Sequence, residues 1–149
     1  MHNICIASIK RSTMKPYDFK WTKFYDLNSD FSYRGLHLNL TEDELIICST
    51  VIDNANYSVL TTQKLVTKEN GIERTGQLNG AEDKGYGDFK GYKKDAITNG
   101  LVELENGDKL KYFIETGKAS MVMIHGLRTL IRTQEMTNQN VENVTRVWN

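Results

Sequence analysis

The most regular alternation of apolar and polar residues lies in the last third of the chain, where every second side chain is apolar: Val102, Leu104, Leu110, Tyr112 and Ile114. A period of two is typical of strands with one buried face, so the stretch predicts a β-hairpin. A two-residue turn would set Leu104 opposite Lys109 on one face. A three-residue loop, with Gly107 in the left-handed conformation, instead pairs Val102 with Leu110, and we expect this register.

The period changes after residue 116, where apolar residues recur at spacings of three and four: Ala119, Met123, Ile124, Leu127, Leu130 and Ile131. This stripe predicts one amphipathic helix over residues 117–135 that closes a hydrophobic core. Met121 and Met123 would suit an adaptable binding face, but methionines at helical spacing more often fill a core. No other stretch gives comparable support for a helix.

Four earlier segments have strand patterns: residues 36–40, 45–52, 57–60 and 64–67. The second is a continuous apolar run, which suits a buried strand. Residues 4–9 also indicate a short strand, with the start of a helix as the alternative. The tripeptide of residues 69–71 is repeated at residues 105–107, so we expect the same turn at both places.

The segment from residue 17 to residue 33 contains half of the fourteen aromatic residues of the chain. We interpret it as an N-terminal arm that either packs on the main core or forms a surface for a protein partner or a second copy, because tyrosine and tryptophan are enriched where protein surfaces meet. The candidate interface residues are Tyr17, Phe19, Trp21, Phe24 and Tyr25.

Residues 76–92 are rich in glycine and form the least regular stretch. If the chain binds a small ligand, this loop and its neighbours supply the candidates: Lys84, Tyr86, Phe89, Lys90, Tyr92 and Lys94. The stretch differs from a phosphate-binding loop, since no buried strand precedes it and no helix follows it. Four lysines face four carboxylates between residues 82 and 95. A surface loop is therefore favoured, with a ligand-contacting loop as the alternative.

The order of Thr41-Glu42-Asp43-Glu44-Leu45-Ile46, the run from Tyr57 to Val66 and the later Asn70-Gly71 resembles bacterial PH-like (pleckstrin-homology-like) domains. Lys64 stands where that family usually has arginine. The resemblance covers about Leu36 to Gln134 and carries no catalytic residue. It implies a mainly β fold, a bent antiparallel and partly open seven-stranded barrel closed by one C-terminal helix.

On this interpretation the chain divides into an N-terminal arm (1–35), a PH-like domain (36–135) and a polar C-terminal tail (136–149). The spacing of valines in the tail allows a second, weak helix, with a docked strand as the alternative. The resemblance also implies a tendency to assemble. An exposed aromatic arm would form an apolar patch that a monomer seldom tolerates, so we expect a homo-oligomer unless the arm folds back on its own domain.

Composition narrows the function classes. The chain of 149 residues is one domain of ordinary size, and 19 basic residues balance 19 acidic ones. No global field therefore draws it to nucleic acid or to an anionic membrane, so we expect neither nucleic acid nor membrane lipid as a partner. Cys5 and Cys48 lie in apolar runs, and no secretory segment is recognisable. Both are expected to be reduced, buried thiols of a cytoplasmic protein.

No combination of residues predicts catalysis. The histidines His2, His37 and His125 do not lie at a metal-binding spacing, and we predict no metal site and no cofactor. His37 faintly resembles one half of a two-histidine phosphoesterase motif, but the second half is missing. We therefore expect a non-catalytic interaction or scaffolding module. The alternative is a small enzyme or phosphate-ligand-binding protein that uses the loop of residues 76–92 and His37.

Overall fold

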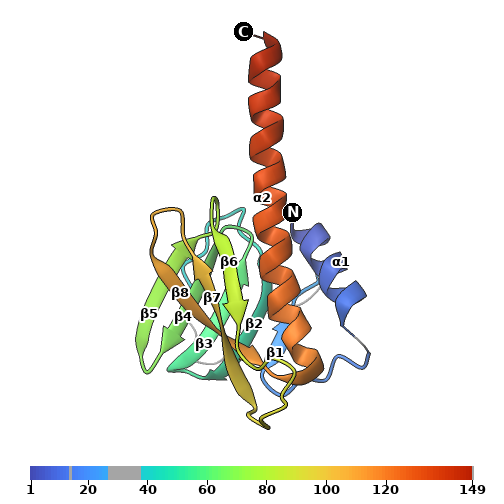
Figure 1. Cartoon of the computed structure of the whole chain (residues 1–149), viewed down its shortest axis with the longest axis vertical. Coiled ribbons are helices and arrows are strands. Elements are labelled where there is room, and N and C mark those ends of the chain that lie inside the picture. Colours follow the sequence, from blue (N-terminus) through green and yellow to red (C-terminus); the bar gives the residue numbers. More distant parts are fainter. Residues whose placement is uncertain (14, 27–37, 149) are drawn as a thin grey trace.

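The computed structural model describes residues 1–13, 15–26 and 38–148, and side-chain surroundings up to residue 136. The protein is mainly β, with two antiparallel sheets and two α-helices beside them (Figure 1). The elements in chain order are α1 (His2–Ser12), β1 (Thr22–Phe24), β2 (Ile46–Asp53), β3 (Asn56–Thr61), β4 (Lys64–Glu69), β5 (Ile72–Gln77), β6 (Glu82–Tyr86), β7 (Ile97–Glu103), β8 (Lys109–Glu115), the 3₁₀ turn η1 (Gly117–Ala119) and α2 (Ser120–Trp148). Among the described residues, no helix is both long and apolar enough to cross a membrane.

The strands form one sheet in the order β1-β2-β3-β4-β5 and a second in the order β6-β7-β8. Within the described ranges no ladder joins the two sheets, so the barrel implied by the resemblance is not closed. Where the sheets meet, a side chain accepts a backbone hydrogen bond between them. The N–H of Phe113 in β8 donates to Ser58 Oγ in β3 at 2.8 Å. Among the described strands, each sheet has two edge strands: β1 and β5 in the large sheet, and β6 and β8 in the small one.

The register of the β7–β8 hairpin is confirmed. Val102 pairs with Leu110, and the loop is closed by a 2.7 Å bond from the N–H of Leu104 to the carbonyl oxygen of Asp108. Gly107 has a φ of +91°, as the three-residue loop requires.

The repeated tripeptide does not make the same turn, so that expectation is wrong. At residues 69–71, Glu69 pairs directly with Ile72, and both Asn70 and Gly71 have positive φ (51° and 82°). This is a two-residue loop of the type that matches the natural twist of two strands. The difference follows from register: each loop takes the length that keeps the apolar side chains of its own strands on the core face.

One hydrophobic core lies between the two sheets and the helices. Five residues of the predicted apolar stripe lie on α2 and are buried in this core, which confirms the predicted face: Met123, Ile124, Leu127, Leu130 and Ile131. The sixth, Ala119, is also buried but ends η1. The large sheet contributes Ile47 and Leu60, and the small sheet contributes Val102 and Ile114. On β3, Leu60 belongs to this core, whereas Val59 belongs to a second buried cluster on the opposite face of the sheet.

The predicted strand at residues 4–9 is wrong, because these residues lie in helix α1. Its buried positions, His2, Cys5, Ile6 and Ile9, follow the helical spacing of three and four. Figure 1 shows α1 beside the first half of α2, and Cys5, Ile6 and Ile9 join the same core as the apolar stripe of α2. The apolar run of residues 4–9 is too short to distinguish helical spacing from strand alternation, and packing against α2 decides between them.

Helix α2 is longer than the predicted span of residues 117–135. It begins at Ser120 and ends at Trp148, so the first alternative for the tail, a helix, holds as a continuation of α2. The predicted boundary at residue 135 therefore falls inside one helix, and Figure 1 shows this helix extending well beyond the sheets. Of the predicted strand at residues 36–40, the described residues 38–40 have no regular structure, and the other two lie outside the described residues.

Candidate functional site

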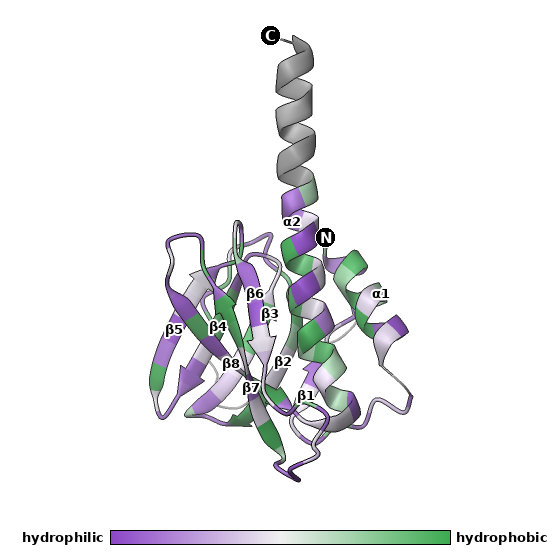
Figure 2. Ribbon diagram, viewed as in Figure 1, coloured by the Kyte–Doolittle hydropathy of each residue, from purple (hydrophilic) through white to green (hydrophobic). Residues whose placement is uncertain are grey.

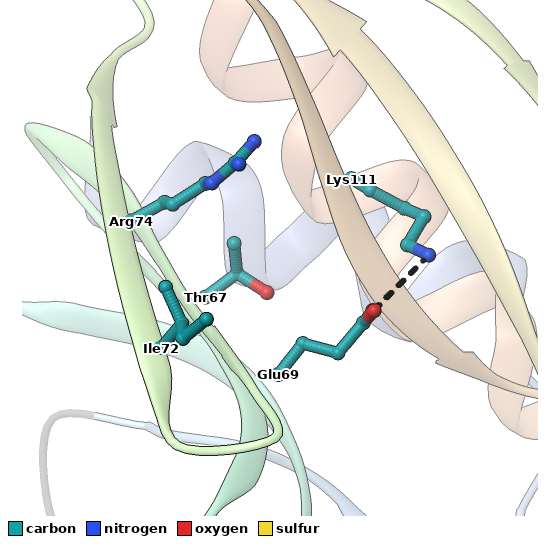
Figure 3. Close-up of a pocket in the computed structure, with 5 residues that line it drawn as sticks. All are labelled: Thr67, Glu69, Ile72, Arg74 and Lys111. Atoms are coloured by element: carbon teal, nitrogen blue, oxygen red, sulfur yellow. Dashed lines mark hydrogen bonds and ion pairs between the residues drawn. The ribbon is translucent and has the colours of Figure 1, made fainter.

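A cavity of about 220 Å³ opens where β5 of the large sheet faces β8 of the small sheet (Figure 3). Its lining residues come from β4, β5 and β8: Thr67, Glu69, Ile72, Arg74 and Lys111. Lys111 Nζ reaches Glu69 Oε2 at 3.1 Å and so forms an ion pair between the two sheets. In Figure 3 the guanidinium of Arg74 extends from β5 into the space between the strands.

A second hollow of about 430 Å³ continues the first, because Arg74 lines both. The other residues around it are Thr75, Leu104, Asp108, Lys109 and Leu110. We name the combined feature, bounded by the residues of these two hollows, the β5–β8 groove. Ile72 is 67% exposed there, a large value for an isoleucine in a regular strand.

The β5–β8 groove has a surplus of positive charge. Within the described part of the chain, neither Arg74 nor Lys109 has an ion-pair partner, whereas Lys111 is paired with Glu69. The remaining carboxylate, that of Asp108, accepts a hydrogen bond from the side chain of Asn106 at 3.1 Å. Two cations thus face one carboxylate beside exposed apolar surface, an arrangement that suits a ligand carrying both a negative charge and an apolar group.

Strand β5 presents a free backbone edge along this groove. It is the last strand of its sheet, and residues 72–75 and 77 are exposed. Figure 2 shows β5 as a mainly hydrophilic strand with one apolar end. The first residue of the strand is Ile72. Polar side chains on both faces of a strand are typical of a sheet edge. This pattern in residues 72–77 is the sequence signal that could have located the site.

The six predicted ligand-loop residues lie outside the β5–β8 groove and do not form one site. Lys84 is paired with Glu82 at 2.9 Å and with Glu103 at 3.1 Å. The rings of Tyr86 and Phe89 meet edge to face at 5.9 Å and pack against the core. Lys90, Tyr92 and Lys94 are exposed on the loop after β6, and Tyr92 is 80% exposed.

Tyr86 belongs to a polar cluster that joins β6 to α2. Its hydroxyl donates to the carboxylate of Asp83 and accepts a hydrogen bond from Arg128 Nη2 at 3.0 Å. Burial, followed by the bond to Asp83, raises the pKa of Tyr86 to about 12. The hydroxyl of Tyr112 is buried and has no hydrogen-bond partner among the described residues. Burial raises the pKa of Tyr112 well above its ordinary value, and the nearby Tyr86 and Asp83 raise it further. We interpret this cluster as a structural clamp that holds β6 against α2.

The two tyrosines of this cluster should respond differently to loss of the hydroxyl. Tyr86→Phe should lower the free energy of unfolding by about 1–2 kcal/mol, because Asp83 and Arg128 lose a shared partner. Tyr112→Phe should leave it unchanged or raise it by up to about 1 kcal/mol, because a buried unpaired hydroxyl disappears. Urea denaturation of both variants checks the pair, and a larger loss for Tyr112→Phe would contradict the clamp.

The described part of the aromatic segment, residues 17–26, folds back on its own domain, and the rest of the segment lies outside the described residues. Phe19 and Phe24 pack against the main core, and the rings of Tyr17 and Phe24 meet edge to face at 5.0 Å. Tyr25 is buried in the second cluster, with its hydroxyl 2.8 Å from Ser49 Oγ. Trp21 is half-buried beneath Lys20 Nζ, which lies 4.5 Å from the ring centroid. These contacts agree with the first alternative, in which the aromatic residues pack on the main core. A role of these residues in self-association stays a prediction.

The remaining candidates for chemistry are His37 and the two cysteines. His37 lies outside the described residues. Cys5 and Cys48 are free and buried, as predicted, and burial raises the pKa of Cys5 to about 11. Thiols in such surroundings are poor nucleophiles. Among the residues that the structure describes, no group of three histidine, cysteine or acidic side chains is arranged to hold a metal ion.

Comparison of the chain with protein-family models, with curated proteins and with solved structures finds no match. The site must therefore be judged from its own geometry. Of the features described above, the β5–β8 groove is the one that combines a cavity, cations without partners and exposed apolar surface.

Proposed function

We propose that this protein is a non-catalytic interaction module of PH-like fold that binds a segment of a partner protein in the β5–β8 groove. The observation that carries the proposal is the position of Arg74, which lines both hollows of the groove, has no ion-pair partner among the described residues, and lies next to the exposed Ile72. A cation and an apolar side chain on one exposed strand suit recognition of a partner. The residues that line the groove include no recognisable nucleophile or general base.

The PH-like assignment is supported by the order of elements within the region of resemblance. Between residues 46 and 115 lie seven antiparallel strands, β2 to β8, divided four and three between the sheets, and one long amphipathic helix follows them. Strand β1 and helix α1 are additions that precede this region. In such a fold the loops and strand edges are available for binding while the helix fills the core.

A random heptapeptide library displayed on phage tests this function. Selection on the immobilised wild-type protein should enrich peptides whose capture falls by at least about tenfold on the double variant Arg74→Glu with Lys109→Glu, because the groove then repels what it attracted. The matched control is Lys90→Ala with Lys94→Ala, which removes two lysines outside the groove and should leave capture unchanged. Failure to enrich any peptide, or enrichment insensitive to the groove variant, would refute the proposal.

A further inference from the structure

We infer that the occupant of the β5–β8 groove is an extended acidic segment of a partner protein, which adds to the free edge of β5 as a further strand of the large sheet. This inference rests on the proposed function and specifies its ligand. It follows from which backbone groups of β5 face outward and from which side chains the incoming segment would meet.

The turn at Asn70 and Gly71 fixes the outward-facing backbone groups. In a two-residue hairpin the residues that flank the turn, here Glu69 and Ile72, exchange both hydrogen bonds, and the bonded and non-bonded pairs then alternate along the ladder. Arg74 and Gly76 therefore bond to β4. The N–H and C=O groups of three residues point away from the sheet: Glu73, Thr75 and Gln77.

Among the described residues, no feature along β5 blocks addition of a strand at this edge. The β4–β5 ladder runs without a register shift from Lys64–Gln77 to Glu69–Ile72. The single proline of the chain is Pro16, far from β5, so no missing N–H interrupts the edge. Edge strands of natural proteins usually carry a bulge, a proline or a covering segment, and a regular uncovered edge is a template for an extended chain.

The side chains along β5 define the chemistry of the segment. Ile72 and Arg74 face the groove, and Gly76 shares this face because a Cβ there would lie 2.7 Å from Leu104 Cδ1. Glu73 lies on the other face, where Tyr57 donates to its carboxylate at 3.5 Å. An added strand would therefore place a carboxylate against Arg74 and Lys109, an apolar side chain beside Ile72, and a polar or basic side chain beside Glu73.

A second copy of this chain is a poorer occupant than an acidic segment. Antiparallel pairing of two β5 strands about Thr75 would use the same outward groups, setting Arg74 opposite Gly76 of the second copy. Arg74 and Lys109 would then gain no anion, whereas a carboxylate of an acidic segment would neutralise both. Charge complementarity thus favours the acidic segment over self-pairing.

The probe for this inference is the fluorescein-labelled heptapeptide Thr-Val-Thr-Glu-Lys-Val-Thr, designed to run antiparallel to β5 with its glutamate opposite Arg74. Fluorescence anisotropy should show saturable binding. Replacing the glutamate by lysine in the peptide, or Arg74 by glutamate in the protein, should weaken binding by at least about tenfold, since attraction becomes repulsion. Titration of both peptides against both proteins shows whether the charge at the glutamate position of the peptide interacts with the charge at residue 74.

The backbone contribution is tested by Thr75→Pro, which removes one outward N–H and no bond to β4, a position where an edge strand tolerates proline. It should weaken peptide binding by at least about tenfold, whereas Thr75→Val should bind within about twofold of wild type. If Thr75→Pro does not fold, the backbone hydrogen bonds are tested by changing the peptide instead of the protein. N-methylation of its central threonine and its lysine should abolish binding, and N-methylation of its glutamate and second valine should not.

The outcomes separate the inference from the proposed function. Phage selection of groove-dependent peptides together with no binding of the designed heptapeptide up to about 1 mM would leave the proposed function standing and overturn the inference. Binding of the heptapeptide that is insensitive to Thr75→Pro and to N-methylation would also overturn it, because the backbone edge would then play no part. A wild-type dimer in sedimentation that Thr75→Pro converts to a monomer would assign the edge to a second copy instead.

Discussion

Replacing Gly100 by alanine should lower the free energy of unfolding by about 3 kcal/mol, the upper end of what overpacking of a well-filled core usually costs. Gly100 lies in β7, paired with Tyr86 on one side and Tyr112 on the other. A Cβ at this position would lie 2.2 Å from Tyr112 Cζ and 2.4 Å from its hydroxyl oxygen. The ring cannot move aside easily, because Tyr112 is only 1% exposed.

Urea denaturation measures this loss, and Gly107→Ala is the matched control. Gly107 has positive φ and nothing within 4 Å of a Cβ, so its substitution adds backbone strain without a clash and should cost about 1 kcal/mol. Combining Gly100→Ala with Tyr112→Leu should recover part of the loss. If Gly100→Ala were no more destabilising than Gly107→Ala, the close packing of Tyr112 over Gly100 would be wrong.

Replacing Ile9 by alanine should lower the free energy of unfolding by about 2–5 kcal/mol, as expected for a large core residue. Ile9 is fully buried, and its Cδ1 would lie 3.3 Å from a Cβ at Gly126 in α2, where the two helices approach closely. The size of the loss measures whether the N-terminal residues belong to the folded core. Thermal and urea denaturation of the variant both report it.

The control for this prediction lies in the same helix. Ile4 is 52% exposed, so Ile4→Ala should change the free energy of unfolding by less than about 0.5 kcal/mol. A strand with alternating burial would place Ile4 and Ile6 on the same face, whereas Ile4 is 52% exposed and Ile6 is 6% exposed. Equal losses for the two variants, or none for either, would contradict the docking of α1 on the core.

The elements that could be predicted from sequence are those whose pattern is long and locally determined. The register of the β7–β8 hairpin follows from alternation on both sides of Gly107, and the buried face of α2 follows from five apolar residues at helical spacing. Helix α1 could not be predicted, because the short run from Ile4 to Ile9 suits either structure until the contact with α2 selects one. Tertiary packing decides such weak local preferences.

The groove could not be predicted because its walls come from different sheets. Arg74 and Lys109 are separated by 34 intervening residues and become neighbours only when β8 packs beside β5. The sequence pattern pointed instead to the glycine-rich segment of residues 76–92, where Tyr86 and Phe89 pack against the core and Tyr92 is exposed. What the sequence did contain was a strand polar on both faces after the turn at Asn70 and Gly71, a pattern that indicates an edge.

Residue-resolved amide hydrogen exchange of β5, with and without the designed heptapeptide, tests the binding account most directly. In the free protein the amides of Ile72, Arg74 and Gly76 should be protected and those of Glu73, Thr75 and Gln77 should exchange rapidly, because only the first set bonds to β4. Saturating peptide should slow exchange at the second set. Peptide binding that leaves Glu73, Thr75 and Gln77 as fast as before would contradict strand addition at β5.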